Sequence, residues 1–125
     1  MRLAVALATA LLAVASPARG APEEEVRLHL RLSTRPYGST EERERLRDLE
    51  YDVMARLAEA GAGRMVRDDW PPGECVVTLA GADARAAWAA IEETVRAYRP
   101  PPGSYAALRA GGPGAPEERV ELGGR

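Results

Sequence analysis

Apolar side chains recur along this chain with two periods, and the order of these periods restricts the fold more than any other feature. From Val26 to Leu32 every second residue is apolar, which is the pattern of a half-buried strand. From Ser39 to about Ala60 the apolar residues are spaced by three and four, which predicts an amphipathic helix. The domain therefore opens with a strand and a helix that covers it.

Cap residues mark both ends of this first helix. Ser39 or Thr40 is the expected N-cap, and Glu41 and Glu42 place negative charge at the positive end of the helix dipole. Gly61 is a suitable C-terminal cap. The apolar stripe consists of Leu46, Leu49, Val53, Leu57 and Ala60.

The second half of the chain repeats this succession. A strand is predicted from Gly63 to Asp69, although residues 64–67 do not alternate cleanly, and a Trp-Pro-Pro-Gly turn at residues 70–73 follows it. The apolar segment from Glu74 to Ala80 predicts a central strand, and Asp83 is the expected N-cap of a second helix. The stripe of this helix is Ala84, Trp88, Ile91, Val95 and Tyr98.

The C-terminal part adds one or two strands. Three prolines at residues 100–102 stop the second helix, and Ser104 to Ala110 reads as a strand. Arg119 to Leu122 is the expected hairpin partner across a loop from Gly111 to Glu118. The order of elements predicts an α+β fold of the ferredoxin-like βαββαβ type, with both helices on one face of an antiparallel sheet.

Part of the second half also carries a family resemblance. A Gly-x-Asp-Ala turn lies at residues 81–84, Trp88 stands in the following helix, and a Leu-Arg-x-Gly-Gly-Pro-Gly hairpin lies at residues 108–114. Residues 81–121 thereby resemble small bacterial ferredoxin-like domains of unassigned function. The resemblance implies the same fold and carries no activity with it.

The first 20 residues have the composition of a cleavable signal peptide. Arg2 is followed by a largely apolar stretch of 13 residues from Leu3 to Ala15, and small residues at Ala18 and Gly20 fit a signal peptidase that cuts before Ala21. A membrane anchor is the alternative, but a span needs about 20 apolar residues. We therefore expect a secreted or periplasmic protein that is not inserted in the membrane after cleavage.

Residues 21–125 form one domain by length, and composition limits its function. The chain carries 17 Lys and Arg against 19 Asp and Glu; without Arg2 and Arg19 the difference gives the mature form a net charge of −4. This charge disfavours nucleic acid as a partner. All 17 of these basic residues are arginine and none is lysine, which is typical of a GC-rich bacterial gene. A single cysteine, Cys75, excludes an internal disulfide.

His29 is the only histidine, and we expect it on the polar side of the first strand between Arg27 and Arg31. It is either a solvated strand residue or a general base. Cys75 has the parity of the core side of its strand, so a nucleophilic pair with His29 is not expected.

Other candidate sites lack the necessary pattern. Asp68 and Asp69 are neighbours in a strand, so they should point to opposite faces. The sequence has no metal-binding motif, and no cofactor is expected. The Gly-rich loop at residues 111–114 lacks the Lys-Ser/Thr of a phosphate-binding loop and predicts a flexible hairpin.

These observations favour a non-catalytic module that binds a protein partner, or a second copy of itself, through the open sheet face. Its expected binding residues are Arg27, His29 and Arg31, with Trp70 at the rim. Their expected neighbours on the third strand are Glu74, Val76 and Thr78. The alternative is a small enzyme in which His29 is the base and Arg27 or Arg31 binds an anionic substrate. A third possibility is a domain kept for its fold alone.

Overall fold

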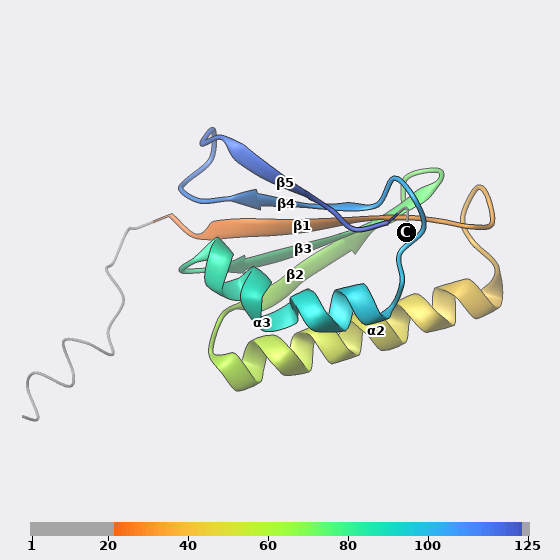
Figure 1. Cartoon of the computed structure of the whole chain (residues 1–125), viewed down its shortest axis with the longest axis horizontal. Helices are drawn as coiled ribbons and strands as arrows, with labels where there is room; N and C mark the ends of the chain where they lie inside the picture. Colours follow the sequence, from red (N-terminus) through yellow and green to blue (C-terminus); the bar gives the residue numbers. More distant parts are fainter. Residues whose placement is uncertain (1–21, 124–125) are drawn as a thin grey trace, which may run out of the picture.

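The computed structural model describes residues 22–123, in which two helices cover one face of an antiparallel sheet (Figure 1). The predicted signal peptide lies outside the described residues. The elements are β1 (Glu24–Arg31), α2 (Thr40–Ala60), β2 (Arg64–Asp69), β3 (Glu74–Gly81), α3 (Ala84–Ala97), β4 (Tyr105–Arg109) and β5 (Glu117–Glu121).

The five strands lie in the order β2-β3-β1-β4-β5, and every neighbouring pair is antiparallel. The first four strands have the ferredoxin-like arrangement, which confirms the predicted fold. The expected C-terminal strand also forms, two residues earlier than predicted, and extends the sheet beyond β4. β3, β1 and β4 are interior strands, and β1 lies at the centre of the sheet.

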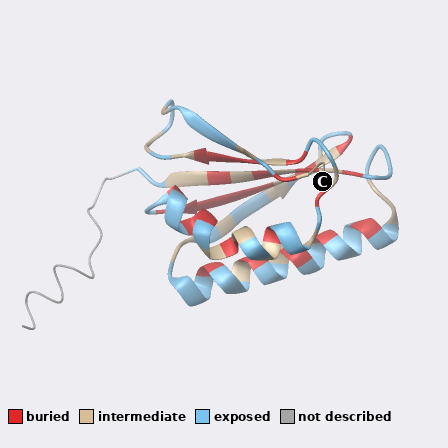
Figure 2. Cartoon of the chain, viewed as in Figure 1, coloured by how far each residue is buried: buried red, intermediate tan, exposed pale blue. Residues whose placement is uncertain are grey.

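The alternation in β1 produces the sheet side of the core. Val26, Leu28 and Leu30 are at most 1% exposed, and they lie beside Leu79, Val77 and Cys75 of β3. The apolar stripes of both helices pack on this face, as the buried segments of Figure 2 show. Burying side chains of this size contributes about 1.5–3 kcal/mol each, before the cost of ordering them. No helix of residues 22–123 covers the opposite face of the sheet (Figure 1).

A buried carboxylate fixes the entry into α2. Ser39 is the N-cap, and its hydroxyl accepts a hydrogen bond from the Glu42 amide at 3.1 Å. The Glu42 carboxylate, in turn, accepts hydrogen bonds from the amides of Ser33 at 2.7 Å and Thr34 at 3.1 Å. Glu42 therefore joins the first turn of the helix to the loop that leaves β1.

A β-bulge explains why the residues of β2 do not alternate cleanly. The pairing of β2 with β3 shifts between Met65 and Arg67, and Val66 between them is 44% exposed. Met65 lies beside Leu79 and Asp68 beside Val77, so both occupy the helix-covered face although they are three residues apart. Asp69 occupies the other face, as expected for the neighbour of Asp68.

Two carboxylate side chains cap the N-terminus of α3. Asp83 is the N-cap and accepts a hydrogen bond from the Ala86 amide at 3.1 Å, as the sequence predicts. Glu24, at the start of β1, accepts a second from the Ala84 amide at 2.9 Å. Both are acceptors at the positive end of the helix dipole. Across residues 22–123, the structure has no helix with the length and apolar composition of a membrane span.

Replacing Glu42 with alanine should lower the free energy of unfolding by about 2–3 kcal/mol, because the amides of Ser33 and Thr34 lose their hydrogen bonds to a buried carboxylate. Urea denaturation followed by circular dichroism measures this change. Glu44→Ala, an exposed position on the same helix, is the control and should change the stability by less than about 0.5 kcal/mol. Equal effects of the two substitutions would show that Glu42 has no structural role.

Candidate functional site

The three residues predicted for the sheet face lie together on β1. In the register of the sheet, Arg27 lies beside Thr78, His29 beside Val76 and Arg31 beside Glu74. These are the neighbours that the sequence predicts. We call this uncovered surface the sheet face; its main side chains are Arg27, His29, Arg31, Glu74, Thr78, Tyr105 and Arg119.

His29 is held by groups from two neighbouring strands. Its Nδ1 atom lies 3.2 Å from Glu74 Oε1, and its ring stacks on Tyr105 with a centroid distance of 4.4 Å and an interplanar angle of 10°. The guanidinium of Arg119 lies 3.7 Å from the centroid of the same tyrosine ring, a cation–π contact. The sequence predicts Glu74 as a neighbour on this face, whereas the contacts of His29 with Tyr105 and of Tyr105 with Arg119 were not predicted.

Arg27 takes part in a small ion-pair network. Its Nη2 atom donates a hydrogen bond to Glu117 Oε2 at 2.5 Å, and its Nε atom lies 3.4 Å from Glu25 Oε1 without an aligned hydrogen bond. Arg109 contacts the same Glu25 oxygen at 3.4 Å. Half-exposed ion pairs of this kind add little stability. Their main effect is to fix the positions of the arginine side chains.

Thr78 lies next to Arg27 in the centre of the sheet face. It is only 1% exposed, and its hydroxyl has no hydrogen-bond partner among the described residues. A buried hydroxyl without a partner costs about 1–3 kcal/mol. The centre of this face therefore carries an uncompensated polar group.

Thr78→Val should leave the stability unchanged or raise it by about 1 kcal/mol, because valine has the same shape without the hydroxyl. Urea denaturation of the variant and the parent measures the difference. Thr78→Ala is the control; it also removes the hydroxyl but leaves a void, and it should destabilise. A loss of stability in Thr78→Val equal to that in Thr78→Ala would contradict this account.

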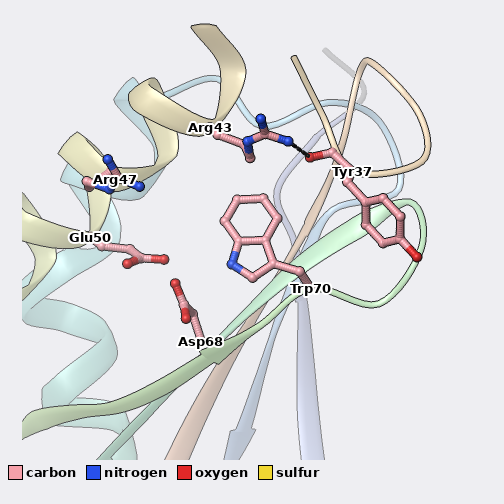
Figure 3. A pocket seen from close by; sticks show the side chains of 6 residues that line it. All are labelled: Tyr37, Arg43, Arg47, Glu50, Asp68 and Trp70. Atoms are coloured by element: carbon pink, nitrogen blue, oxygen red, sulfur yellow. Dashed lines mark hydrogen bonds between the residues drawn. The ribbon is translucent and has the colours of Figure 1, made fainter. Parts of the chain in front are cut away.

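Trp70 does not lie at the rim of the sheet face. It packs against the core on the helix side, and with residues of α2 it lines a cavity of about 380 Å³ (Figure 3). We call this cavity the α2–β2 pocket. Its lining residues are Tyr37, Arg43, Arg47, Glu50, Asp68 and Trp70.

Glu50 and Asp68 approach each other across the α2–β2 pocket (Figure 3). Burial raises the pKa of Glu50 to about 8, aided by a hydrogen bond with Asp68 and by its charge, while Arg47 acts in the opposite direction. At neutral pH the two carboxyl groups therefore hold one proton between them. Asp68 faces α2 because of the bulge at Val66.

Cys75 lies behind this pair, on the core side of β3. Its thiol donates a hydrogen bond to Glu50 Oε2 at 3.9 Å, and burial, with the negative charges of Glu50 and Asp68, raises its pKa well above the usual range. The thiol is therefore protonated and unreactive. Cys75 lies beside Leu30, on the face opposite His29, which confirms that the two residues do not form a nucleophilic pair.

Sequence reasoning found no metal motif, but three possible ligands meet here. Glu50, Asp68 and Cys75 each offer one ligand atom, and these three atoms lie within 4.8 Å of one another. Thiolate and carboxylate ligands suit zinc, which usually takes four ligands in structural sites. The three residues do not form a motif of fixed spacing in the sequence, because they come from three different elements.

One signal for the pocket was present in the sequence. Glu50 follows Leu46 by four residues and precedes Val53 by three, so it occupies a stripe position of the amphipathic helix. An ionisable residue in an apolar stripe requires a partner. Its partner, Asp68, was not predictable, because its orientation depends on a bulge.

Comparisons with protein-family models, with curated proteins and with solved structures return no significant match for this chain. The site is therefore interpreted from its own geometry.

The stability should depend on pH through Glu50. The folded pKa of about 8 lies above the ordinary value of 4.5, so the protonated form stabilises the native state fully below pH 4.5. This contribution is lost as the pH rises from 4.5 to about 8. Urea denaturation at several pH values should show that the free energy of unfolding declines over this range. Glu50→Gln should flatten this decline, and the control Glu44→Gln should retain it. An unchanged slope in Glu50→Gln would contradict the assignment.

Proposed function

We propose that the protein is a non-catalytic module, exported from the cytoplasm, that binds a protein partner through the sheet face. The observation that carries this proposal is the ordered group of Arg119, Tyr105, His29 and Glu74 on a face that no helix covers. Export is supported by the composition of residues 1–20.

The side chains of the sheet face suit protein recognition. Arginine and tyrosine are enriched at interfaces and among the residues that contribute most binding energy. Here Arg27 is held by Glu25 and Glu117, and Tyr105 is held between neighbouring planar groups. Ordering these side chains before association lowers the entropic cost of binding.

The size of the face also suits a small interface. Strand spacing and residue rise give five strands of this length a flat area of roughly 500 Å². A specific interface buries about 800 Å² on each partner, and weaker ones bury less. The sheet face together with its protruding side chains is therefore large enough for a modest, reversible association.

One contact favours the alternative, a small enzyme with His29 as general base and Arg27 or Arg31 as the anion-binding group. The carboxylate of Glu74 lies at hydrogen-bond distance from His29, as an orienting group does in many catalytic pairs. A base also needs a concave site from which water is excluded. Tyr105 covers one face of the imidazole, and the α2–β2 pocket lies on the other side of the sheet. This arrangement favours binding over catalysis.

Site-specific photocrosslinking in the producing cell tests the binding proposal. A photoreactive amino acid replaces Arg119 on the sheet face in one variant and Arg56 on α2 in a matched control; both arginines are exposed and ion-paired. The proposal expects a discrete adduct with a protein from position 119 and none from position 56. Adding Arg27→Ser, His29→Ser and Arg31→Ser should reduce the yield about tenfold or more.

Two controls make this experiment decisive. Urea denaturation must show that the triple variant remains folded, and mass spectrometry must identify the adduct. An adduct between two copies of this chain would mean that the sheet face binds a second copy and not a different protein. Adducts from position 56 alone, or a yield that the triple variant leaves unchanged, would contradict the use of the sheet face.

A further inference from the structure

The α2–β2 pocket contains charged groups of both signs. Arg43 lies above Trp70 at one end of the cavity, and the carboxyl groups of Glu50 and Asp68 lie at the other end (Figure 3). Arg47, one helical turn from Arg43 on α2, lies beside Glu50 (Figure 3). Two guanidinium groups therefore face the same space as two carboxyl groups. None of these four residues belongs to the sheet face.

In the part of the chain that the structure describes, neither arginine of the pocket forms a close ion pair with a carboxylate. Arg43 donates hydrogen bonds to the carbonyl oxygens of Tyr37 at 3.4 Å and Gly38 at 3.3 Å, which fix its guanidinium above the cavity (Figure 3). Arg47 is exposed, and it acts on Glu50 through charge rather than through a short contact. Both guanidinium groups retain N–H donors for an anionic group.

The negative end is the Glu50–Asp68 pair, whose carboxyl groups lie close enough to form a hydrogen bond. A cationic group beside them would be attracted by both carboxyl groups. Trp70 lies between the two ends and presents its indole to the cavity (Figure 3). An indole face accepts both apolar groups and cations.

The size of the cavity limits the ligand. Its volume of about 380 Å³ lies at the lower end of the range for small-molecule sites. It suits a ligand of one or two amino-acid residues. A purely anionic ligand would be repelled by Asp68, and a purely cationic ligand by the two arginines.

We propose that the α2–β2 pocket binds a small zwitterion, a free amino acid or a dipeptide, with an apolar or aromatic side chain. Its carboxylate contacts Arg43 and Arg47, its ammonium group lies between Glu50 and Asp68, and its side chain packs on Trp70. This ligand matches each charged end of the pocket with a group of opposite sign. The site lies on the other side of the sheet from the proposed partner surface and does not depend on it.

Titration of the purified protein with L-phenylalanine and with glycyl-L-phenylalanine tests the proposal. Trp70 reports binding by fluorescence, and Trp88→Phe removes the signal of the other tryptophan. The structure predicts a saturable change with at least one probe below about 10 mM. The two probes distinguish a free amino acid from a dipeptide.

Analogues of the probe test each charged end without changing the protein. N-acetyl-L-phenylalanine lacks the ammonium group, and L-phenylalaninamide lacks the carboxylate. Each should bind the parent protein about tenfold more weakly or worse, because a charged hydrogen-bonded contact is lost. Equal binding of all three compounds would overturn the proposal even if every protein variant failed to fold.

Three variants test the residues. Arg47→Gln and Asp68→Asn should each weaken binding about tenfold, whereas Arg56→Gln, a matched arginine on α2 outside the pocket, should leave it unchanged. Equal affinities in all three variants would overturn the assignment. The absence of saturable binding by either probe would also overturn the proposal. The same holds if the protein binds only Zn²⁺ and loses this binding in Cys75→Ser.

Discussion

The packing of β1 against the two helical stripes is the interaction on which the rest of the structure depends. β1 is the central strand, and its alternate residues Val26, Leu28 and Leu30 supply the middle of the core. Because the side-chain period of a strand is two, this burial also directs Arg27 and His29 to the opposite face. The position of the candidate binding surface is thus a direct consequence of core formation.

The fold was predictable because its signals are local. The alternation of β1, the stripes of α2 and α3, and the caps Ser39 and Asp83 each lie within a few residues of the element that they define. These signals placed every element within about two residues, and they also placed Cys75 in the core. Parity along one strand was sufficient to bring Arg27, His29 and Arg31 together.

The parts that were not predictable depend on contacts between distant segments. Tyr105, which stacks on His29, comes from β4, and the pocket joins α2 to β2 and its following turn. Trp70 was expected near the sheet face, but its orientation follows from the bulge in β2 and not from its own identity. The broken alternation at residues 64–67 marks an irregular strand, but it does not show that the irregularity is a bulge or which residue is the extra one.

The bulge at Val66 decides which charged residue faces the pocket. If the same residues were paired regularly beyond Met65, Arg67 would lie beside Val77 on the helix-covered face and Asp68 would turn outward. A carboxyl pair would then become a carboxylate–guanidinium pair in an unchanged fold. In this region of the molecule, the register of one strand, and not only its sequence, sets the charges that a ligand meets.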